Sequence, residues 1–177
     1  GTKARLAIAL LLYTGVRRSD VVTLGPQMER EGWLTFTEAK NRRNKPKARE
    51  LPILPELREA IDAAPSGHLS YLVTEFGKPF TANGFGNWFK KRCREAGIEH
   101  CSAHGLRKTG ATRAANNGAT TKQLMAIFGW ETIKEADHYT KRADKKRLVE
   151  SGMHHLSLER KMDIRVPLSK HKGSQND

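Results

Sequence analysis

Residues 102–140 read SAHGLRKTGATRAANNGATTKQLMAIFGWETIKEADHYT, and this stretch decides the fold. It contains a His-x-x-Arg motif, formed by His104 and Arg107, with Trp130 and Tyr139 downstream of it. On a helix, side chains three positions apart lie on one face, so this imidazole and this guanidinium can converge on the same phosphate. The stretch therefore predicts a phosphate-binding site.

Three helices are expected within these residues. The first covers 104–117 and is rich in Ala, Leu, Arg and Lys; the second covers 122–128, and the third carries Tyr139. Residues that favour helix ends mark their boundaries: Ser102, Gly118, Thr120 or Thr121, Gly129 and Thr132. The two turns permit Tyr139 to return to the neighbourhood of His104.

The composition favours a single basic domain. The chain has 177 residues, enough for one hydrophobic core, and 32 lysines and arginines against 19 acidic residues give it a net charge of +13. Such an excess favours a polyanion, most commonly nucleic acid, although charge alone also allows a merely solvated basic surface. No apolar run is long enough to span a bilayer.

Neither the cysteines nor the histidines predict a metal site. Cys93 and Cys101 are too few for a disulfide scaffold or a metal cluster, which favours reduced, intracellular thiols. His154 and His155 are adjacent and cannot both face one helical site. We therefore expect no metal and no cofactor.

The rest of the chain predicts further helices and one hairpin. Helices are expected over 2–13, 19–24, 55–64 and 83–96, strands over 33–39 and 50–54, and a short edge strand over 71–74. The aromatic stripe of the 83–96 helix is expected in the core. A sharp turn at 14–17 places Arg17 at a helix junction, and a basic helix is expected to continue from Tyr139 to Gly152.

The hairpin carries a cationic tip. Its basic residues are Lys40, Arg42, Arg43, Lys45, Lys47 and Arg49. Each can make one nonspecific phosphate contact whose strength falls with salt. Alternatively, Lys40 reaches a reacting phosphate, with Lys45 as the second candidate. Lys108, Lys141 and Arg142 are further expected DNA contacts.

The candidate site residues suit one reaction, the attack of a tyrosine on a phosphodiester. A phosphodiester under attack gains negative charge, which the forks of Arg17 and Arg107 can neutralise without a metal ion. The Tyr139 oxygen can attack the phosphorus while His104 accepts its proton or holds the phosphate. Lys40 is the candidate acid for the departing sugar hydroxyl. The phosphotyrosine bond conserves the energy, so rejoining needs no ATP.

Four motifs resemble those of the tyrosine recombinases, the phage-integrase class of site-specific DNA recombinases. They are TGVRRSD at 14–20, HGLR at 104–107, FGW at 128–130 and HYT at 138–140. The resemblance implies a mainly α domain with a small antiparallel β-sheet over 1–153, in which Tyr139 forms a 3′-phosphotyrosyl link and releases a 5′-hydroxyl. Trp130 stands where many members carry histidine, and Asp20 stands where glutamate is commoner.

The resemblance also implies partners. It implies binding to double-stranded DNA as a homo-tetramer, a monomer without DNA, accessory DNA-bending proteins, and a cytoplasmic, nucleoid-associated location in a prokaryotic or phage-infected cell. An N-terminal core-binding domain is expected to be absent from this chain. The tail, 154–177, is expected to be disordered or exchanged between protomers.

Three alternatives remain open at this point. Residues 120–130 loosely match the start of a helix-turn-helix, so a basic bundle could be a repressor or architectural factor without catalysis. A type IB topoisomerase would use the same tyrosine chemistry to relax supercoils without exchanging strands. An inactive relic would only bind DNA.

Overall fold

The computed structural model describes residues 1–39, 46–141, 143, 145–153 and 156. Its elements, in chain order, are α1 (Lys3–Thr14), α2 (Arg18–Val21), the 3₁₀ turn η1 (Pro26–Met28), β1 (Glu29–Arg30), β2 (Trp33–Thr37), β3 (Ala48–Pro52), α3 (Pro55–Asp62), α4 (Ala82–Glu95), α5 (Ala103–Asn116), α6 (Thr121–Phe128), α7 (Ile133–Thr140) and α8 (Lys145–Met153). The fold is mainly helical with one small antiparallel sheet, as expected. None of the helices in these described ranges is long and apolar enough to cross a membrane.

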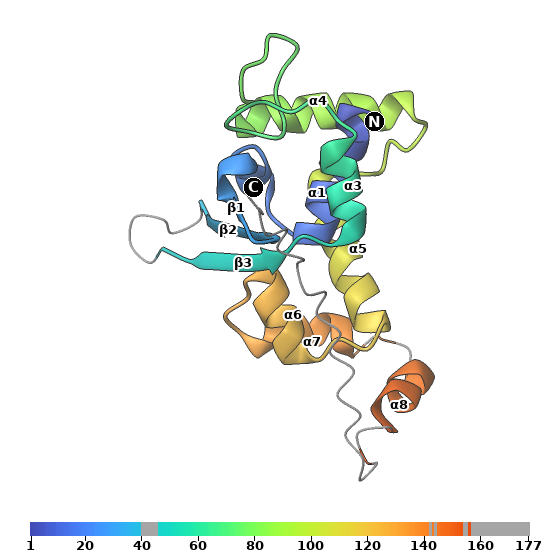
Figure 1. Ribbon diagram of the computed structural model, residues 1–177. Coiled ribbons are helices and arrows are strands. Elements are labelled where there is room, and N and C mark those ends of the chain that lie inside the picture. Colours follow the sequence, from blue (N-terminus) through green and yellow to red (C-terminus); the bar gives the residue numbers. More distant parts are fainter. Residues whose placement is uncertain (40–45, 142, 144, 154–155, 157–177) are drawn as a thin grey trace, which may run out of the picture.

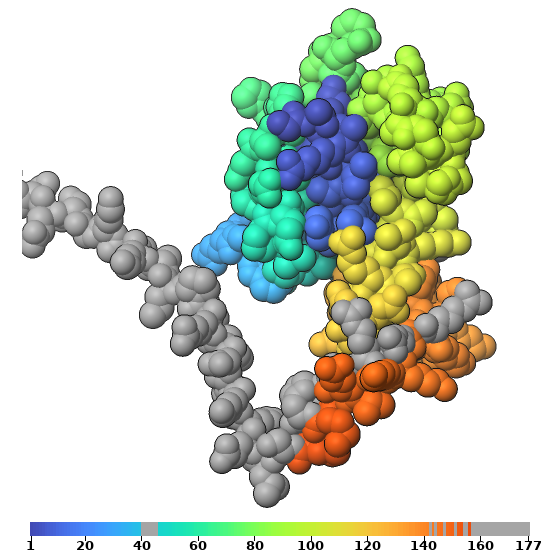
Figure 2. Space-filling view, turned by 90° about the vertical axis from the view of Figure 1, so that its right-hand side faces the viewer, coloured from blue at the N-terminus to red at the C-terminus, as the bar shows by residue number. Residues whose placement is uncertain are grey.

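Helix α5 connects the two ends of the molecule (Figure 1). It packs against α1 near the middle and against α6 and α7 at its C-terminal end. Helix α4 crosses the opposite end, and the three-stranded sheet lies beside α1. In the space-filling view, α8 projects from the end formed by α6 and α7 (Figure 2). Different lengths of α5, the helix of the His-x-x-Arg motif, are therefore held by different parts of the chain.

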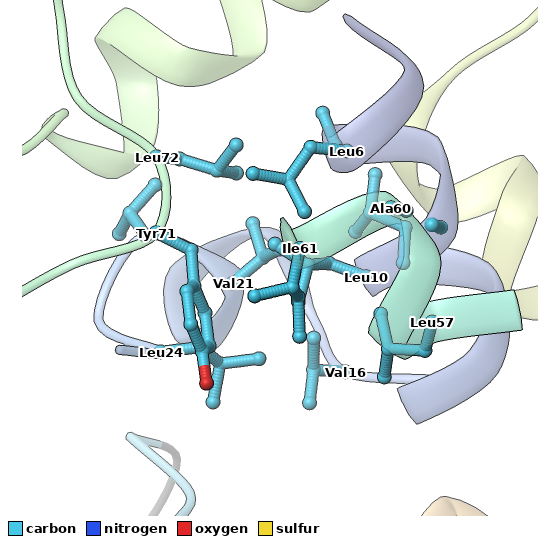
Figure 3. Packing of buried hydrophobic residues seen from close by; sticks show 14 of the residues in the cluster. Leu6, Leu10, Val16, Val21, Leu24, Leu57, Ala60, Ile61, Tyr71 and Leu72 are labelled. Atoms are coloured by element: carbon cyan, nitrogen blue, oxygen red, sulfur yellow. The ribbon is translucent and has the colours of Figure 1, made fainter. Parts of the chain in front are cut away.

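The main core forms where α1, α3 and α4 meet the loops between them. Side chains from α1, α3 and the 71–72 segment interlock there, including Leu6, Leu10, Leu57, Tyr71 and Leu72 (Figure 3). All of these side chains are almost completely removed from solvent. Burial of apolar area on this scale is what fixes α1 and the turn that follows it.

Gly15 ends α1 in the left-handed conformation, with φ of 57°. A Cβ atom at this position would lie 2.4 Å from the ring of Phe128. Only glycine adopts this left-handed conformation readily and also leaves room for the Phe128 ring. The tight turn brings Arg17 back over the start of α2 and toward α5.

The sheet has the order β1-β2-β3, and both pairs are antiparallel. Phe36 lies opposite Arg49 and Leu34 lies opposite Leu51, and these four side chains face the core. The predicted hairpin is confirmed, but β2 ends two residues earlier than expected and β3 begins and ends two residues earlier. Strand β1 was not expected. The prediction of a strand over 71–74 was wrong, because this segment forms only an isolated bridge between Val73 and Pro79.

The predicted helix caps are confirmed. Ser102 accepts a hydrogen bond from the backbone of α5, and Thr120 forms a reciprocal capping box with Gln123. Thr81 caps α4 in the same way as Ser102 caps α5. The aromatic stripe of α4 lies in the core, with Phe85 and Phe89 buried.

The prediction of a continuous helix from Tyr139 to Gly152 was wrong. Helix α7 ends at Thr140 and α8 begins at Lys145. The backbone N–H of Ala143 donates to Thr140 O at 3.2 Å, and Ala143 packs into a second apolar cluster with Leu124 and Phe128. Burial of Ala143 outweighs the local preference for a helix.

Candidate active site

A cavity of about 280 Å³ opens where the α1–α2 turn, the start of α4 and the start of α5 meet. Its lining includes Arg17, His104 and Arg107, together with Val16, Arg18, Ser19 and Ala82. The structure therefore brings two predicted arginines and the predicted histidine into one hollow. Four cationic or protonatable side chains, Arg18 included, surround this cavity and favour an anion there.

Arg107 forms the floor of this site. Its side chain donates hydrogen bonds to Gly15 O and, at 2.6 Å, to Phe128 O, and the residue is 6% exposed. Burial, followed by repulsion from Arg17 and Arg49, lowers the pKa of Arg107 to about 10. The guanidinium remains protonated at neutral pH. It is thus a fixed, desolvated positive charge.

Arg17 lines the same cavity from the start of α2. It occupies the N-cap of α2 in extended conformation, and its side chain is 31% exposed. Its Nη1 donates to Glu38 Oε2 at 2.7 Å. His104, in the first turn of α5, is exposed and shares the lining with both arginines.

The predicted nucleophile sits at the end of an aromatic stack. The ring of Phe128 stacks on Trp130 with centroids 5.0 Å apart, and Trp130 stacks on Tyr139 at 5.2 Å with the rings 8° from parallel. The guanidinium of Arg107 lies over the rings of Phe128 and Trp130, at 5.6 and 5.7 Å. Tyr139 is half-buried and does not line the cavity itself. The stack packs the Tyr139 ring against the second apolar cluster, one ring away from the Arg107 guanidinium.

The prediction that Arg49 contacts DNA was wrong. It is 4% exposed, donates to Glu38 Oε1 at 3.2 Å and to Thr14 O at 2.8 Å, and also bonds Ile127 O. Burial is the main reason that its pKa is lowered, although Glu38 opposes that effect. A side chain enclosed by β2, α1 and α6 cannot reach a phosphate on the surface.

The structure locates some of the other predicted contacts. Lys40, Arg42, Arg43, Lys45 and Arg142 lie outside the described residues. Lys47 is half-buried, donates to Gly129 O at 2.5 Å and lies 3.6 Å from a Glu131 oxygen. Lys108 is exposed on α5, and the exposed Lys141 pairs with Asp137 at 2.6 Å. Lys108 and Lys141 therefore remain candidate DNA contacts.

The phage integrase family model matches residues 1–146. The chain belongs to this family. The integrase of Mycobacterium phage L5 is 31% identical over 160 residues, a match that covers 76% of this chain and 42% of that integrase. This phage-integrase chain therefore spans less than half the length of that curated relative.

Solved structures with a similar fold include two integrases. The catalytic domain of bacteriophage HP1 integrase is 26% identical, with a TM-score of 0.63 over 86% of this chain and 82% of that one. The Tn1549 transposon integrase in complex with transposon right end DNA has a TM-score of 0.63 at 22% identity, over 85% of this chain and 58% of that one. The family match favours the recombinase interpretation over a type IB topoisomerase.

One residue of this integrase-family site was missed by the sequence analysis. Glu38 is 3% exposed and bonds both Arg17 and Arg49. The signal was the alternation of β2, since Leu34, Phe36 and Glu38 occupy every second position and share the inward face. An acidic residue at an inward position should have indicated a buried cationic partner.

Gly129 is predicted to be intolerant of a side chain. It ends α6 with φ of 64°, and a Cβ atom there would lie 2.6 Å from Glu38 Oε1 and 3.0 Å from Arg49 Cδ. Gly129→Ala should lower the free energy of unfolding by about 1–2 kcal/mol for the left-handed backbone and by about 1–3 kcal/mol for the overpacking. Urea denaturation would measure the loss. Gly97→Ala is the matched control, because Gly97 has φ of 71° but nothing within 4 Å of its Cβ position; equal losses in the two variants would refute the clash.

Proposed function

We propose that this chain is the catalytic domain of a site-specific DNA recombinase that cleaves and rejoins DNA through a 3′-phosphotyrosyl intermediate. One observation carries the proposal: Arg17, His104 and Arg107 line one cavity, and the guanidinium of Arg107 lies over the Trp130 ring on which Tyr139 stacks. The family match and the likeness to HP1 integrase support it.

The proposed step is an exchange of one ester for another. The Tyr139 oxygen attacks the scissile phosphorus, a new P–O bond forms to tyrosine, and the bond to the 5′ oxygen of the next nucleotide breaks. The phenol proton passes to a base, for which His104 is our candidate, and the 5′ oxygen takes a proton from an acid, for which we propose Lys40. Arg17 and Arg107 neutralise the charge that develops on the nonbridging oxygens. Attack by a 5′-hydroxyl reverses the step and needs no ATP.

Trp130 is proposed to position the nucleophile. Its ring is sandwiched between Phe128 and Tyr139. An indole can donate one hydrogen bond but cannot shuttle a proton. We therefore propose that Trp130 binds and orients the reacting groups. The proton transfers are assigned to other residues.

The proposed partner is double-stranded DNA. The net charge of +13 supports it, as does the fold shared with an integrase whose structure contains transposon DNA. We further propose a homo-tetramer on DNA and a monomer without it, with accessory DNA-bending proteins. The proposed catalytic domain covers 1–153, and the prediction made for the 154–177 tail concerns residues that, apart from Leu156, lie outside the described part of the chain. Its proposed location is the nucleoid of a prokaryotic or phage-infected cell.

A selection for covalent adducts from randomised DNA would test the function and find the DNA site in one experiment. The chain is incubated with a pool of duplexes that carry a nick beside a randomised segment, so that cleavage releases a short fragment and traps the protein. Adducts are recovered after denaturation, their DNA is sequenced, and the linked peptide is identified by mass spectrometry. We expect one enriched sequence joined through its 3′ phosphate to Tyr139. Retention of DNA without any adduct, or linkage to another residue, would overturn the proposal.

A further inference from the structure

Glu38 is a buried carboxylate directly behind the candidate site. It lies immediately after β2, and its backbone N–H donates to Lys47 O at 3.0 Å across the base of the hairpin. Its two oxygens accept hydrogen bonds from different arginines, Oε2 from Arg17 and Oε1 from Arg49. Glu38 does not line the cavity, whereas Arg17 does. The carboxylate therefore contacts the lining of the cavity through Arg17.

Arg49 fixes the Glu38 carboxylate in place. Besides Glu38, its guanidinium bonds the carbonyl oxygens of Thr14 and Ile127, and it lies 5.2 Å from the centre of the Phe36 ring. These contacts tie the hairpin to the C-terminal ends of α1 and α6. Because Arg49 is almost completely buried, Glu38 cannot move away without leaving a charge unpaired in the interior.

The charge balance of the site depends on the same carboxylate. Arg17, Arg49 and Arg107 are close enough to influence one another electrostatically, and the positive charges of Arg17 and Arg49 lower the pKa of Arg107 after the larger effect of burial. Glu38 opposes that effect. Among the described residues the other buried acid is Asp20, which accepts a hydrogen bond from the Ala39 backbone N–H at 2.7 Å and also opposes the lowering of the Arg49 pKa.

We propose that Glu38 is a positioning residue for Arg17, an inference that rests on the proposed function. It holds Nη1 of Arg17 and leaves the remaining donors of that guanidinium for the nonbridging oxygens of the scissile phosphate. A guanidinium has five N–H donors in a rigid fork, so one edge can bind a carboxylate while another binds the phosphate. Among the described residues, Glu38 is the only partner of the Arg17 side chain in a hydrogen bond or salt bridge. Without this anchor, an arginine that is one-third exposed would sample many rotamers.

A double-mutant cycle would test the proposal. Wild type, Glu38→Gln, Arg17→Ala and the double variant are compared in single-turnover adduct formation on the nicked duplex selected above, with thermal unfolding and DNA retention measured alongside. Glu38→Gln should slow cleavage by about 100-fold, as expected for a misplaced catalytic group. In the Arg17→Ala background the same change should slow cleavage by less than about threefold, because the two effects are coupled. Glu50→Gln, on the exposed face of β3, is the matched control and should cleave at the wild-type rate.

The outcomes separate this inference from the proposed function. If wild type forms no Tyr139 adduct, the function itself fails. If wild type cleaves and Glu38→Gln slows cleavage equally in both backgrounds, or not at all, Glu38 does not act through Arg17 and the inference is wrong. Should Glu38→Gln fail to unfold cooperatively, the cycle is run with Glu38→Asp, which keeps the charge for Arg49 but shortens the reach toward Arg17. The effect of Glu38→Asp on cleavage is then compared between wild type and Arg17→Ala, and an equal effect in both would overturn the inference.

Discussion

Tyr139→Phe should abolish the covalent protein–DNA adduct while leaving DNA retention nearly unchanged. The substitution removes one oxygen and keeps the ring, which stacks on Trp130 with centroids 5.2 Å apart. The aromatic stack and the position of Arg107 should therefore survive. Because no other atom replaces the nucleophile, the cleavage rate should fall by on the order of 10⁶-fold, as for other covalent enzymes. A denaturing gel of the protein with labelled, nicked DNA measures the adduct, and a native gel measures retention.

Tyr13→Phe is the matched control for that experiment. Tyr13 is a partly buried tyrosine that packs against the main core and does not line the candidate site. This variant should form the adduct at the wild-type rate. An adduct that persists in Tyr139→Phe, or one that disappears in both variants, would contradict the assignment of the nucleophile.

The sequence predicted the helices of the site because their ends are set by local chemistry. Ser102 accepts a hydrogen bond from Gly105 N at 3.0 Å, and Gly129 adopts the left-handed conformation that the pattern indicated. Such signals depend on neighbouring residues only. With these ends fixed, α5, α6 and α7 fold back on one another, and Tyr139 returns to Arg107.

The sequence failed where burial, rather than local preference, decides. The basic hairpin residues were treated as one solvated group, yet Arg49 and Leu51 occupy buried positions of β3, and Lys47, just before that strand, donates to Gly129 O. Arg49 is tolerated inside because Glu38 pairs with it, and that pairing requires a strand register that composition does not specify.

The break between α7 and α8 has the same origin. Residues 141–144 contain neither glycine nor proline, and the one local boundary signal is Asp144, a residue type that favours an N-cap, directly before Lys145. The chain turns there because Ala143 packs into the cluster that includes Phe128. A tertiary contact of this kind can be found only once the neighbouring helices have been placed.

Arg107→Lys should cause the second largest loss, although both side chains are positively charged. The arginine fork donates to Gly15 O and to Phe128 O while its face lies over the Trp130 ring. An ammonium is a point charge on a flexible stem and cannot hold both carbonyl groups and a phosphate in one plane. At least one buried carbonyl should be left unpaired, which costs about 1–3 kcal/mol of the free energy of unfolding.

Cleavage should fall further than this loss of stability implies. Loss of one preorganised donor to a developing oxyanion slows reactions by about 10²–10³-fold. Single-turnover adduct formation, measured well below the unfolding temperature of the variant, separates the two effects. Arg113→Lys is the control, because Arg113 lies exposed near the other end of α5. If Arg107→Lys cleaved as fast as Arg113→Lys, the fork geometry would be irrelevant to the reaction, and Arg107 would serve only to join α5 to the turns at Gly15 and Phe128.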